Sequence, residues 1–205
     1  DAAGNPAGVF KDAAMSYIYR VIPDSSWDEK MEFAQAATEH AASLGITSVT
    51  DVSGGTDIGV YQELIRQGKL KTRIYGCSPL SDYQRWARTG VRYAFGSAML
   101  RVGCLKGYAD GSLGSTTAWL FEPYLDDPKT SGLAGEDIPK TEEYVKAADK
   151  AGLQVNIHAI GDKANATILD IYEKAIQANG PRDRRFRIEH AQHLRQEDIK
   201  RFGSL

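Results

Sequence analysis

The sequence lacks the features that mark membrane and nucleic-acid-binding proteins. It has no run of 18 apolar residues, and it opens as DAAGNPAG, with neither a Met nor a basic leader, so the opening looks like a cut end. Lysines and arginines number 25 against 27 aspartates and glutamates, a net charge of -2 with no basic block. We therefore expect no nucleic-acid or membrane partner, and a small molecule as ligand. The sequence leaves a homo-oligomer open.

Cysteine is also scarce. The two cysteines, Cys77 and Cys104, stand in separate apolar runs and form no CxxC pair. Such isolated cysteines are typical of buried thiols in a reducing compartment, so we expect a cytoplasmic protein with two free thiols.

What is present favours one α/β domain over residues 1–205. Hydrophobic residues make up 42% of the 205 positions, enough for a core. Five β-rich segments begin near residues 46, 71, 100, 153 and 185, and helical patterns separate them. Strands that alternate with helices predict a parallel sheet, in a barrel or in a doubly wound fold.

The segment 153–162 shows how strand and site are connected. Odd positions from Leu153 to Ala159 are apolar and even positions are polar, which predicts a strand with a polar face ending at His158. Gly161 then permits a turn that a side chain would hinder, before a predicted helix. Asp162 either orients a ligand or caps that helix.

Spacing favours the barrel over the open sheet. A second strand-end histidine, His190, follows His158 by 190 - 158 = 32 residues, close to the roughly 31 residues per unit when about 250 residues form eight repeats. Lys106 ends an earlier strand, and a connection of more than 25 residues follows it, long enough for a lid or binding loop. Three reactive side chains thus end three strands, where barrel enzymes place their chemistry.

The chemistry of these three residues leaves alternatives open. His158 and His190 either share a metal such as Zn²⁺ or form a hydrogen-bonded pair. Lys106 points into the expected interior, where it could act as a Schiff-base nucleophile, take up CO2 as a carbamate that bridges two cations, or simply pair with Asp110. His40, within a predicted helix, and His193, beyond its strand, are expected to bind no metal.

Three ordered motifs carry a family resemblance. Residues 106–118 (KGYADGSLGSTTA), 156–164 (NIHAIGDKA) and 187–192 (RIEHAQ) resemble the YtcJ-like branch of the amidohydrolase superfamily, amidohydrolase family 3, which includes N-substituted formamide deformylase. Residues 2–10 and 45–51 are similar to the same family. The resemblance implies a (β/α)8 TIM barrel and a metal-dependent hydrolase of non-peptide C–N bonds.

Carried over by position, the resemblance assigns site residues. His158 and His190 match the metal ligands of the fifth and sixth barrel strands, and Lys106 matches the bridging, often carboxylated lysine of the fourth. Asp110, Gly111 and Ser112 are expected in the substrate pocket or next to the ligands, as is Asp162. The implied cofactor is one or two divalent cations, with zinc expected.

The departures from the family are as informative. The chain contains no HxH pair and no match to the catalytic Asp of the eighth strand, so we expect no catalytic residue in it. It is interpreted as a partial barrel, about strands 2 to 6, without strands 1, 7 and 8 and without the β-sandwich domain. Such a fragment should hold metal weakly and be inactive alone. Two other hypotheses remain open: a Schiff-base lyase that uses Lys106, and a truncated remnant that only binds.

Overall fold

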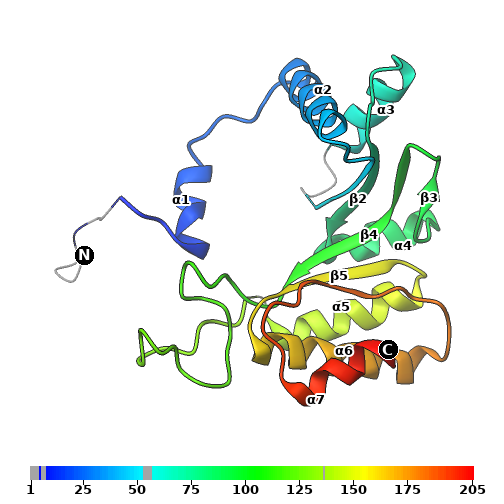
Figure 1. Ribbon diagram of the computed structural model, residues 1–205. Helices are drawn as coiled ribbons and strands as arrows, with labels where there is room; N and C mark the ends of the chain where they lie inside the picture. Colours follow the sequence, from blue (N-terminus) through cyan, green and yellow to red (C-terminus); the bar gives the residue numbers. More distant parts are fainter. Residues whose placement is uncertain (1–4, 6–7, 53–56, 136) are drawn as a thin grey trace.

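The fold is built on a curved parallel sheet with helices on its outer face (Figure 1). The computed structural model describes residues 5, 8–52, 57–135 and 137–205; parts of the opening motif (2–4 and 6–7) and of the loop after the first predicted strand (53–56) lie outside the described residues. The parallel strands, in spatial order, are β1 (Ser48–Asp51), β2 (Arg73–Pro79), β4 (Leu100–Tyr108), β5 (Gln154–Ala159) and β6 (Arg187–His190). A two-residue strand, β3 (Phe95–Gly96), pairs antiparallel with β4. All five predicted strands are confirmed.

Helices connect the strands as the alternating pattern predicts. They are α2 (Trp27–Ser43) before β1, α3 (Ile58–Arg66), α4 (Tyr83–Thr89), α5 (Ile138–Lys150), α6 (Asp162–Asn179) and α7 (Gln196–Ile199), with short 3-10 turns at Asp12–Met15 (η1), Leu80–Asp82 (η2) and Lys200–Gly203 (η3). The sheet order, in which sequential strands lie side by side, is that of a barrel and not of a doubly wound sheet. The chain is thus part of a TIM barrel, as expected. Among the described residues, no helix combines the length and apolarity needed to cross a bilayer.

Local signals set the helix boundaries. Ser26 and Glu29 form a reciprocal capping box at the start of α2. Helix α4 ends at Gly90, which adopts the left-handed conformation that glycine allows. At the start of α5, the Asp137 side chain accepts a hydrogen bond from the backbone N–H of Lys140.

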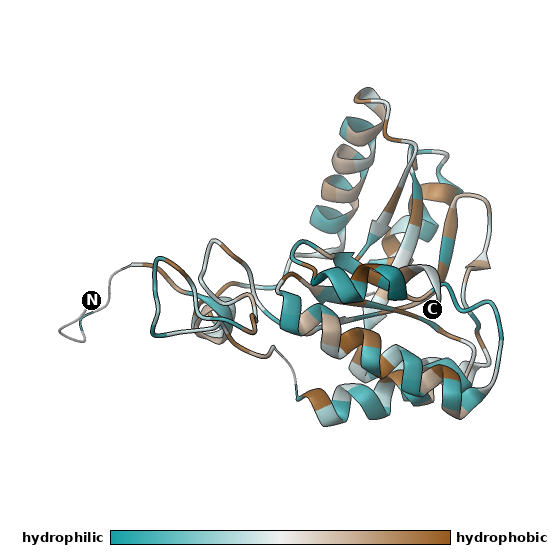
Figure 2. Cartoon of the chain, turned by 60° about the horizontal axis from the view of Figure 1, so that its bottom comes forward, coloured by the Kyte–Doolittle hydropathy of each residue, from teal (hydrophilic) through white to brown (hydrophobic). Residues whose placement is uncertain are grey.

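The outer face of the sheet carries the core. Under α5 and α6, a cluster of fully buried residues joins β4 and β5 to the helices; its largest members are Leu105, Leu153, Val155, Ile157, Ile168 and Ile171. A smaller cluster around Val60 and Leu64 packs α3 against β1 and β2. Figure 2 shows brown and teal alternating along these helices, as amphipathic helices require.

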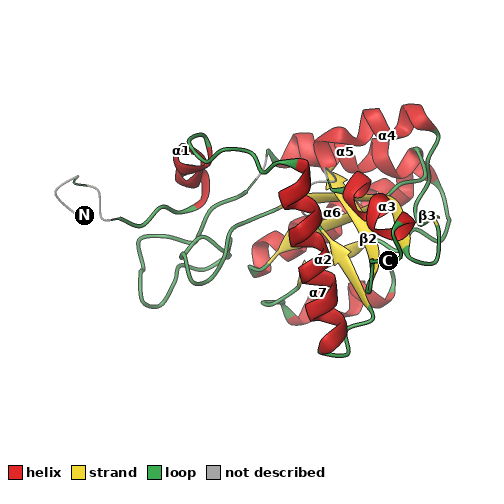
Figure 3. Cartoon of the chain, turned by 90° about the horizontal axis from the view of Figure 1, so that it is seen from above, coloured by secondary structure: helices red, strands yellow, loops and turns green. Residues whose placement is uncertain are grey.

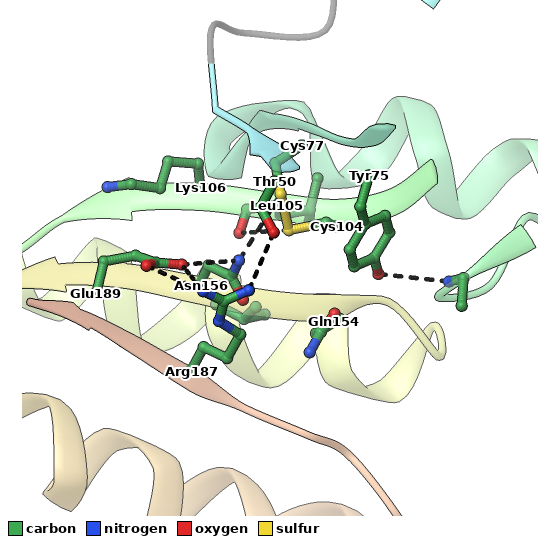
Figure 4. Close-up of a disulfide and its surroundings, with 12 residues drawn as sticks. Thr50, Tyr75, Cys77, Cys104, Leu105, Lys106, Gln154, Asn156, Arg187 and Glu189 are labelled. Atoms are coloured by element: carbon green, nitrogen blue, oxygen red, sulfur yellow. Dashed lines mark hydrogen bonds and ion pairs between the residues drawn. A yellow bond between two sulfur atoms is a disulfide. The ribbon is translucent and has the colours of Figure 1, made fainter. Parts of the chain in front are cut away.

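The inner face of the sheet is polar. Thr50, Asn156, Arg187 and Glu189 all lie on it, on β1, β5 and β6 (Figure 4). Arg187 donates to the Thr50 hydroxyl at 3.1 Å, although 137 residues separate them, so the two edge strands of the sheet are in contact across the inner face.

The prediction of two free thiols is wrong. Cys77 of β2 and Cys104 of β4 form a disulfide on the inner face (Figure 4). The two residues are 27 apart in sequence, but the parallel register places them directly opposite each other, with 4.3 Å between Cα atoms. The expectation of a reducing compartment loses its basis, since it rested on free thiols.

Two segments project from the sheet on one side. In Figures 1 and 3, α1 (Ser16–Tyr19) and the connection between β4 and α5 extend together away from the strands. Lys11 donates to the backbone carbonyl of Ser115 at 3.0 Å, a hydrogen bond that joins the two segments.

Candidate metal centre

His158 stands near the carboxyl end of β5, with its ring fixed by the chain that follows β4. Its Nε2 lies 2.8 Å from the carbonyl oxygen of Gly111 and 3.2 Å from Oδ1 of Asp110. Both neighbours are acceptors, so Nε2 carries a proton and Nδ1 keeps the lone pair. A metal-ligating histidine commonly has this arrangement, in which its other nitrogen is held by a carbonyl or carboxylate.

His190 ends β6 and turns toward His158. Its φ is 77°, and Ala191 follows with φ 45°, a backbone conformation that residues other than glycine rarely adopt. The two imidazole rings meet edge to face with centroids 4.6 Å apart. Burial lowers the pKa of His190, and the nearby His158 and Lys106 lower it further. The neutral imidazole, the form that binds metal, is therefore favoured near neutral pH.

Lys106 lies on the inner face of β4, buried to 6% exposure, as its strand position predicts. Its ammonium donates to the carbonyl of Gly107 at 2.6 Å and stands 3.4 Å from the ring centroid of Tyr108. A carbonyl oxygen and an aromatic face both stabilise a charged amine. These contacts suit the ammonium form of Lys106, whereas a Schiff base or a carbamate requires the neutral amine.

The histidine pair fits a divalent cation in part. The pair offers imidazole nitrogens from adjacent strand ends, and Lys106 lies on the next strand. Within the described ranges, however, no three histidine, cysteine or carboxylate side chains are placed to hold one ion together. These residues can supply two ligands, and a closed site needs more.

Asp110 organises the chain around the histidine. Its buried carboxylate accepts backbone hydrogen bonds from Trp119 (2.9 Å), Ile160 (3.0 Å) and Gly161 (2.7 Å). Placed against His158 as well, it acts as a positioning group.

Gly111 and Ser112 begin a compact turn. Gly111 donates its N–H to the carbonyl of Thr117 at 3.1 Å, and the Thr117 hydroxyl accepts from the N–H of Ser112 at 3.1 Å. A Cβ at Gly111 would stand 2.0 Å from that hydroxyl oxygen, so only glycine fits. Gly111 contributes its carbonyl to His158, while Ser112 bonds within the turn.

Asp162 does not cap α6, and its predicted position next to a ligand stays a prediction. It is the first residue of α6, and its Oδ1 accepts from the backbone N–H of Phe121 at 3.0 Å. The N-cap is Gly161, without a side-chain cap. Gly161 has an ordinary φ of -70°, so its backbone conformation does not require glycine. Glycine is required by space, because a Cβ there would stand 2.0 Å from the carbonyl oxygen of Trp119.

A cavity of about 840 Å³ opens beside Lys106. Its lining includes Tyr108, Leu80, Tyr144 and Thr141. The hydroxyl oxygen of Thr141 is buried and has no hydrogen-bond partner among the described residues. Sequence reasoning passed over Tyr108, although it shares the parity of Lys106 and its register partner on β5 is His158.

The other two histidines lie apart from this group. His40 is exposed on α2. The backbone of His193 bonds to Ile160 and to the side chain of Asn165, which fixes the chain after β6.

Comparisons with known proteins agree with the geometry. Two solved structures have the same fold, and both are of uncharacterized metal-dependent hydrolases. The one from Pyrococcus furiosus has a TM-score of 0.81 and 30% identity, over 98% of this chain and 43% of that one. The one from Pyrococcus horikoshii OT3 has a TM-score of 0.82 and 28% identity, over 98% of this chain and 42% of that one.

Similar curated proteins include Protein LONG AFTER FAR-RED 3 of Arabidopsis thaliana, 39% identical over 99% of this chain and 37% of that protein. YtcJ of Bacillus subtilis (strain 168) is 32% identical over 98% and 38%. N-substituted formamide deformylase of Arthrobacter pascens is 24% identical over 93% and 37%. This chain thus spans well under half the length of each. The sequence profile of the Amidohydrolase family matches residues 1–205, and the chain belongs to that family.

Proposed function

We propose that the protein carrying this chain is a metal-dependent hydrolase that cleaves amide-type, non-peptide C–N bonds in small molecules. In this reaction water adds across the bond: its oxygen goes to the carbonyl carbon, and the nitrogen leaves with a proton as an amine. The membership in the Amidohydrolase family supports hydrolysis. The name of one relative, N-substituted formamide deformylase, supports an amide-type substrate.

The observation that carries the proposal is the meeting of His158 and His190. Their rings come from adjacent strand ends, 4.6 Å apart, beside a buried lysine. In the proposed enzyme these histidines hold a divalent cation, with zinc favoured by the imidazole ligands. When bound, the cation would acidify water and polarise the substrate carbonyl. The carbonyl of Gly111 would keep His158 in the tautomer that leaves Nδ1 free to ligate.

Lys106 has a proposed role in the same centre. Its ammonium would first lose one proton, and the neutral amine would then bond to the carbon of CO2 and lose a second proton, giving a carbamate whose oxygens would serve as metal ligands. The unmodified Lys106 side chain, with its contacts to Gly107 and Tyr108, is then the form before that reaction. In ¹³C-bicarbonate, a carbamate carbon signal should appear with metal and be missing in Lys106→Arg.

The substrate is proposed to enter the cavity beside Lys106. Its volume of about 840 Å³ suits a small organic molecule. The aromatic rings of Tyr108 and Tyr144 would contact apolar parts of the substrate. The hydroxyl of Thr141, which has no partner in the described part of the chain, would offer one hydrogen bond. Neither the charge of -2 nor the cavity favours a nucleic acid or a membrane as partner.

Activity is proposed for the whole polypeptide, because the chain spans only 37% to 38% of two of its curated relatives. His158→Ala and His190→Ala in that polypeptide should each remove bound metal, measured by mass spectrometry of the eluted ions, and hydrolysis of N-substituted formamides and simple amides. His40→Ala, on exposed α2, is the matched control and should retain both. Full metal content with full turnover in either strand-end variant would refute the proposal.

A further inference from the structure

A second cavity, of about 650 Å³, lies at the amino ends of the strands, away from the histidine pair. Its lining carries four arginines, Arg73, Arg101, Arg185 and Arg187, together with neutral polar and aromatic groups: Ser48, Thr50, Tyr75, Tyr93 and Gln154. Among the described residues that line it, none is an aspartate or a glutamate. Figure 4 shows Arg187, Tyr75, Thr50 and Gln154 on this inner face.

The register of the sheet brings these arginines together. Arg73 starts β2 opposite Ser48, and Arg101 stands opposite Tyr75 near the start of β4. Arg187 starts β6 opposite Asn156. Side chains at paired positions point to the same face, so arginines from three strands and the segment before β6 share one concave surface.

The positive charge is only half balanced. Arg187 pairs with Glu189 at 3.0 Å and Arg185 with Asp183 at 3.0 Å. Arg73 donates only to the hydroxyl of Thr47 and Arg101 to the carbonyl of Ser97, and in the part of the chain that the structure describes no carboxylate lies within 4.0 Å of either guanidinium. Among the described residues, these two guanidinium groups therefore have no carboxylate as counter-charge, in a chain whose net charge is negative.

Catalysis does not account for this cluster. In barrel enzymes the chemistry occupies the carboxyl ends of the strands, where Lys106, His158 and His190 lie, and the amino ends serve stability. Uncompensated arginines at the amino ends cost stability through mutual repulsion, so a stabilising role leaves them unexplained.

We propose that this cavity binds an anionic small molecule through a phosphate group. Guanidinium forks donate paired hydrogen bonds to phosphate oxygens, and Arg73 and Arg101 have donors to spare. The hydroxyls of Ser48 and Tyr75 add neutral donors. Burial raises the pKa of the Tyr75 phenol, and the hydrogen bond from the Ala94 N–H and the charges of Arg187 and Arg101 offset this only in part, so the phenol keeps its proton. The cavity is independent of the proposed hydrolase function.

The rival occupant is an acidic segment of a longer polypeptide, whose carboxylates would fill the same space. The two proposals predict different results when phosphate is added: an empty cavity binds it, whereas a cavity filled by carboxylates does not. Inorganic phosphate, pyrophosphate and glycerol phosphate would be titrated calorimetrically into the whole polypeptide at fixed low ionic strength. Comparing the affinities of the three probes shows whether the cavity prefers a free inorganic anion or an organic phosphate ester.

The test variant is Arg73→Gln/Arg101→Gln, and the matched control is Arg20→Gln/Arg88→Gln, which removes two exposed arginines elsewhere. Saturable binding of at least one probe is expected in the wild type and the control, weakening by about tenfold or more in the test variant. In the wild type, the same probe should protect Arg73 and Arg101 from phenylglyoxal, read by peptide mass spectrometry, which needs no variant to fold.

Equal affinity in all three proteins, or protection of neither arginine, would overturn the proposal. So would the absence of saturable binding together with a lower melting temperature of the test variant, which is the result expected if carboxylates of another segment occupy the cavity. Loss of phosphate binding with metal content unchanged would leave the hydrolase proposal untouched.

Discussion

The carboxylate of Asp110 accepts a 2.7 Å hydrogen bond from the backbone N–H of Gly161, 51 residues further along the chain. The same side chain accepts from Trp119 and Ile160 and lies 3.2 Å from Nε2 of His158. One buried carboxylate therefore fixes the start of the long connection, the end of β5 and the orientation of a proposed metal ligand.

Asp110→Asn should destabilise this junction. The amide keeps one acceptor oxygen, but its NH₂ group would face backbone donors, leaving at least one buried N–H unpaired. We expect a loss of about 1–3 kcal/mol in the free energy of unfolding. Urea unfolding measures the loss, and hydrogen exchange at Trp119 and Gly161 should locate it.

Asp126→Asn is the control for that experiment, because Asp126 is exposed in the same connection. It should leave both measurements unchanged. Equal stability of the two variants would mean that the hydrogen bonds of Asp110 contribute nothing net to the fold.

The disulfide gives a second prediction. Denatured without reductant, the protein should show no thiol that reacts with a maleimide, and two after reduction. Replacing Cys77 and Cys104 by serine should lower the free energy of unfolding by about 2–4 kcal/mol, since the bond restricts the unfolded chain. Two reactive thiols in the unreduced, denatured protein would contradict the pairing.

The fold could be predicted from the sequence because its signals are local. The alternation from Leu153 to Ala159 places apolar side chains under the helices and His158 on the inner face, as the structure has it. The box of Ser26 and Glu29 marks the start of α2 within four residues of sequence. The 32-residue interval between His158 and His190 predicts the barrel because it is close to the length of one repeating strand-helix unit.

What the sequence did not reveal depends on register. Cys77 and Cys104 meet because β2 pairs with β4 at one offset, and no local pattern specifies that offset. The four arginines of the second cavity are scattered from 73 to 187, so their clustering is likewise visible only once the strands are aligned. The reason for Gly161 lies in the backbone of Trp119, 42 residues away by 161 - 119, and not in its own turn.

Acid should destabilise the segment around α7. Asp198, 1% exposed, pairs with Arg195 at 2.7 Å and Arg201 at 2.9 Å. Burial raises the pKa of Asp198, but the hydrogen bonds from the two arginines outweigh it, so the pKa lies below its usual 3.8. A carboxyl whose pKa is lower in the folded state stabilises the fold above its unfolded pKa, and this stability is lost as the pH falls through the folded pKa.

Asp198→Asn isolates this effect because asparagine does not titrate. In urea unfolding from about pH 6 down to about pH 2, the wild type should exceed the variant in stability at the upper end, and the difference should shrink below about pH 4. Other carboxyl groups titrate in both proteins and cancel in the difference. A difference that is constant over the whole range would exclude the pKa shift as a source of stability.

The fit of the long connection against α6 depends on the missing side chain of Gly161. A Cβ there would stand 2.0 Å from the carbonyl oxygen and 2.5 Å from the carbonyl carbon of Trp119, and a backbone cannot swing aside as a flexible side chain can. Gly161→Ala should therefore displace residues near Trp119 and cost about 1–3 kcal/mol of unfolding free energy.

Gly114→Ala is the matched control, since it lies in the same connection and a Cβ there meets no atom within 4 Å. Tryptophan fluorescence should shift in the first variant and not in the second, and because Asp110 holds both Gly161 and His158, the first variant should also bind less metal. Equal melting temperatures and equal spectra for the two variants would show that the connection does not pack here as described.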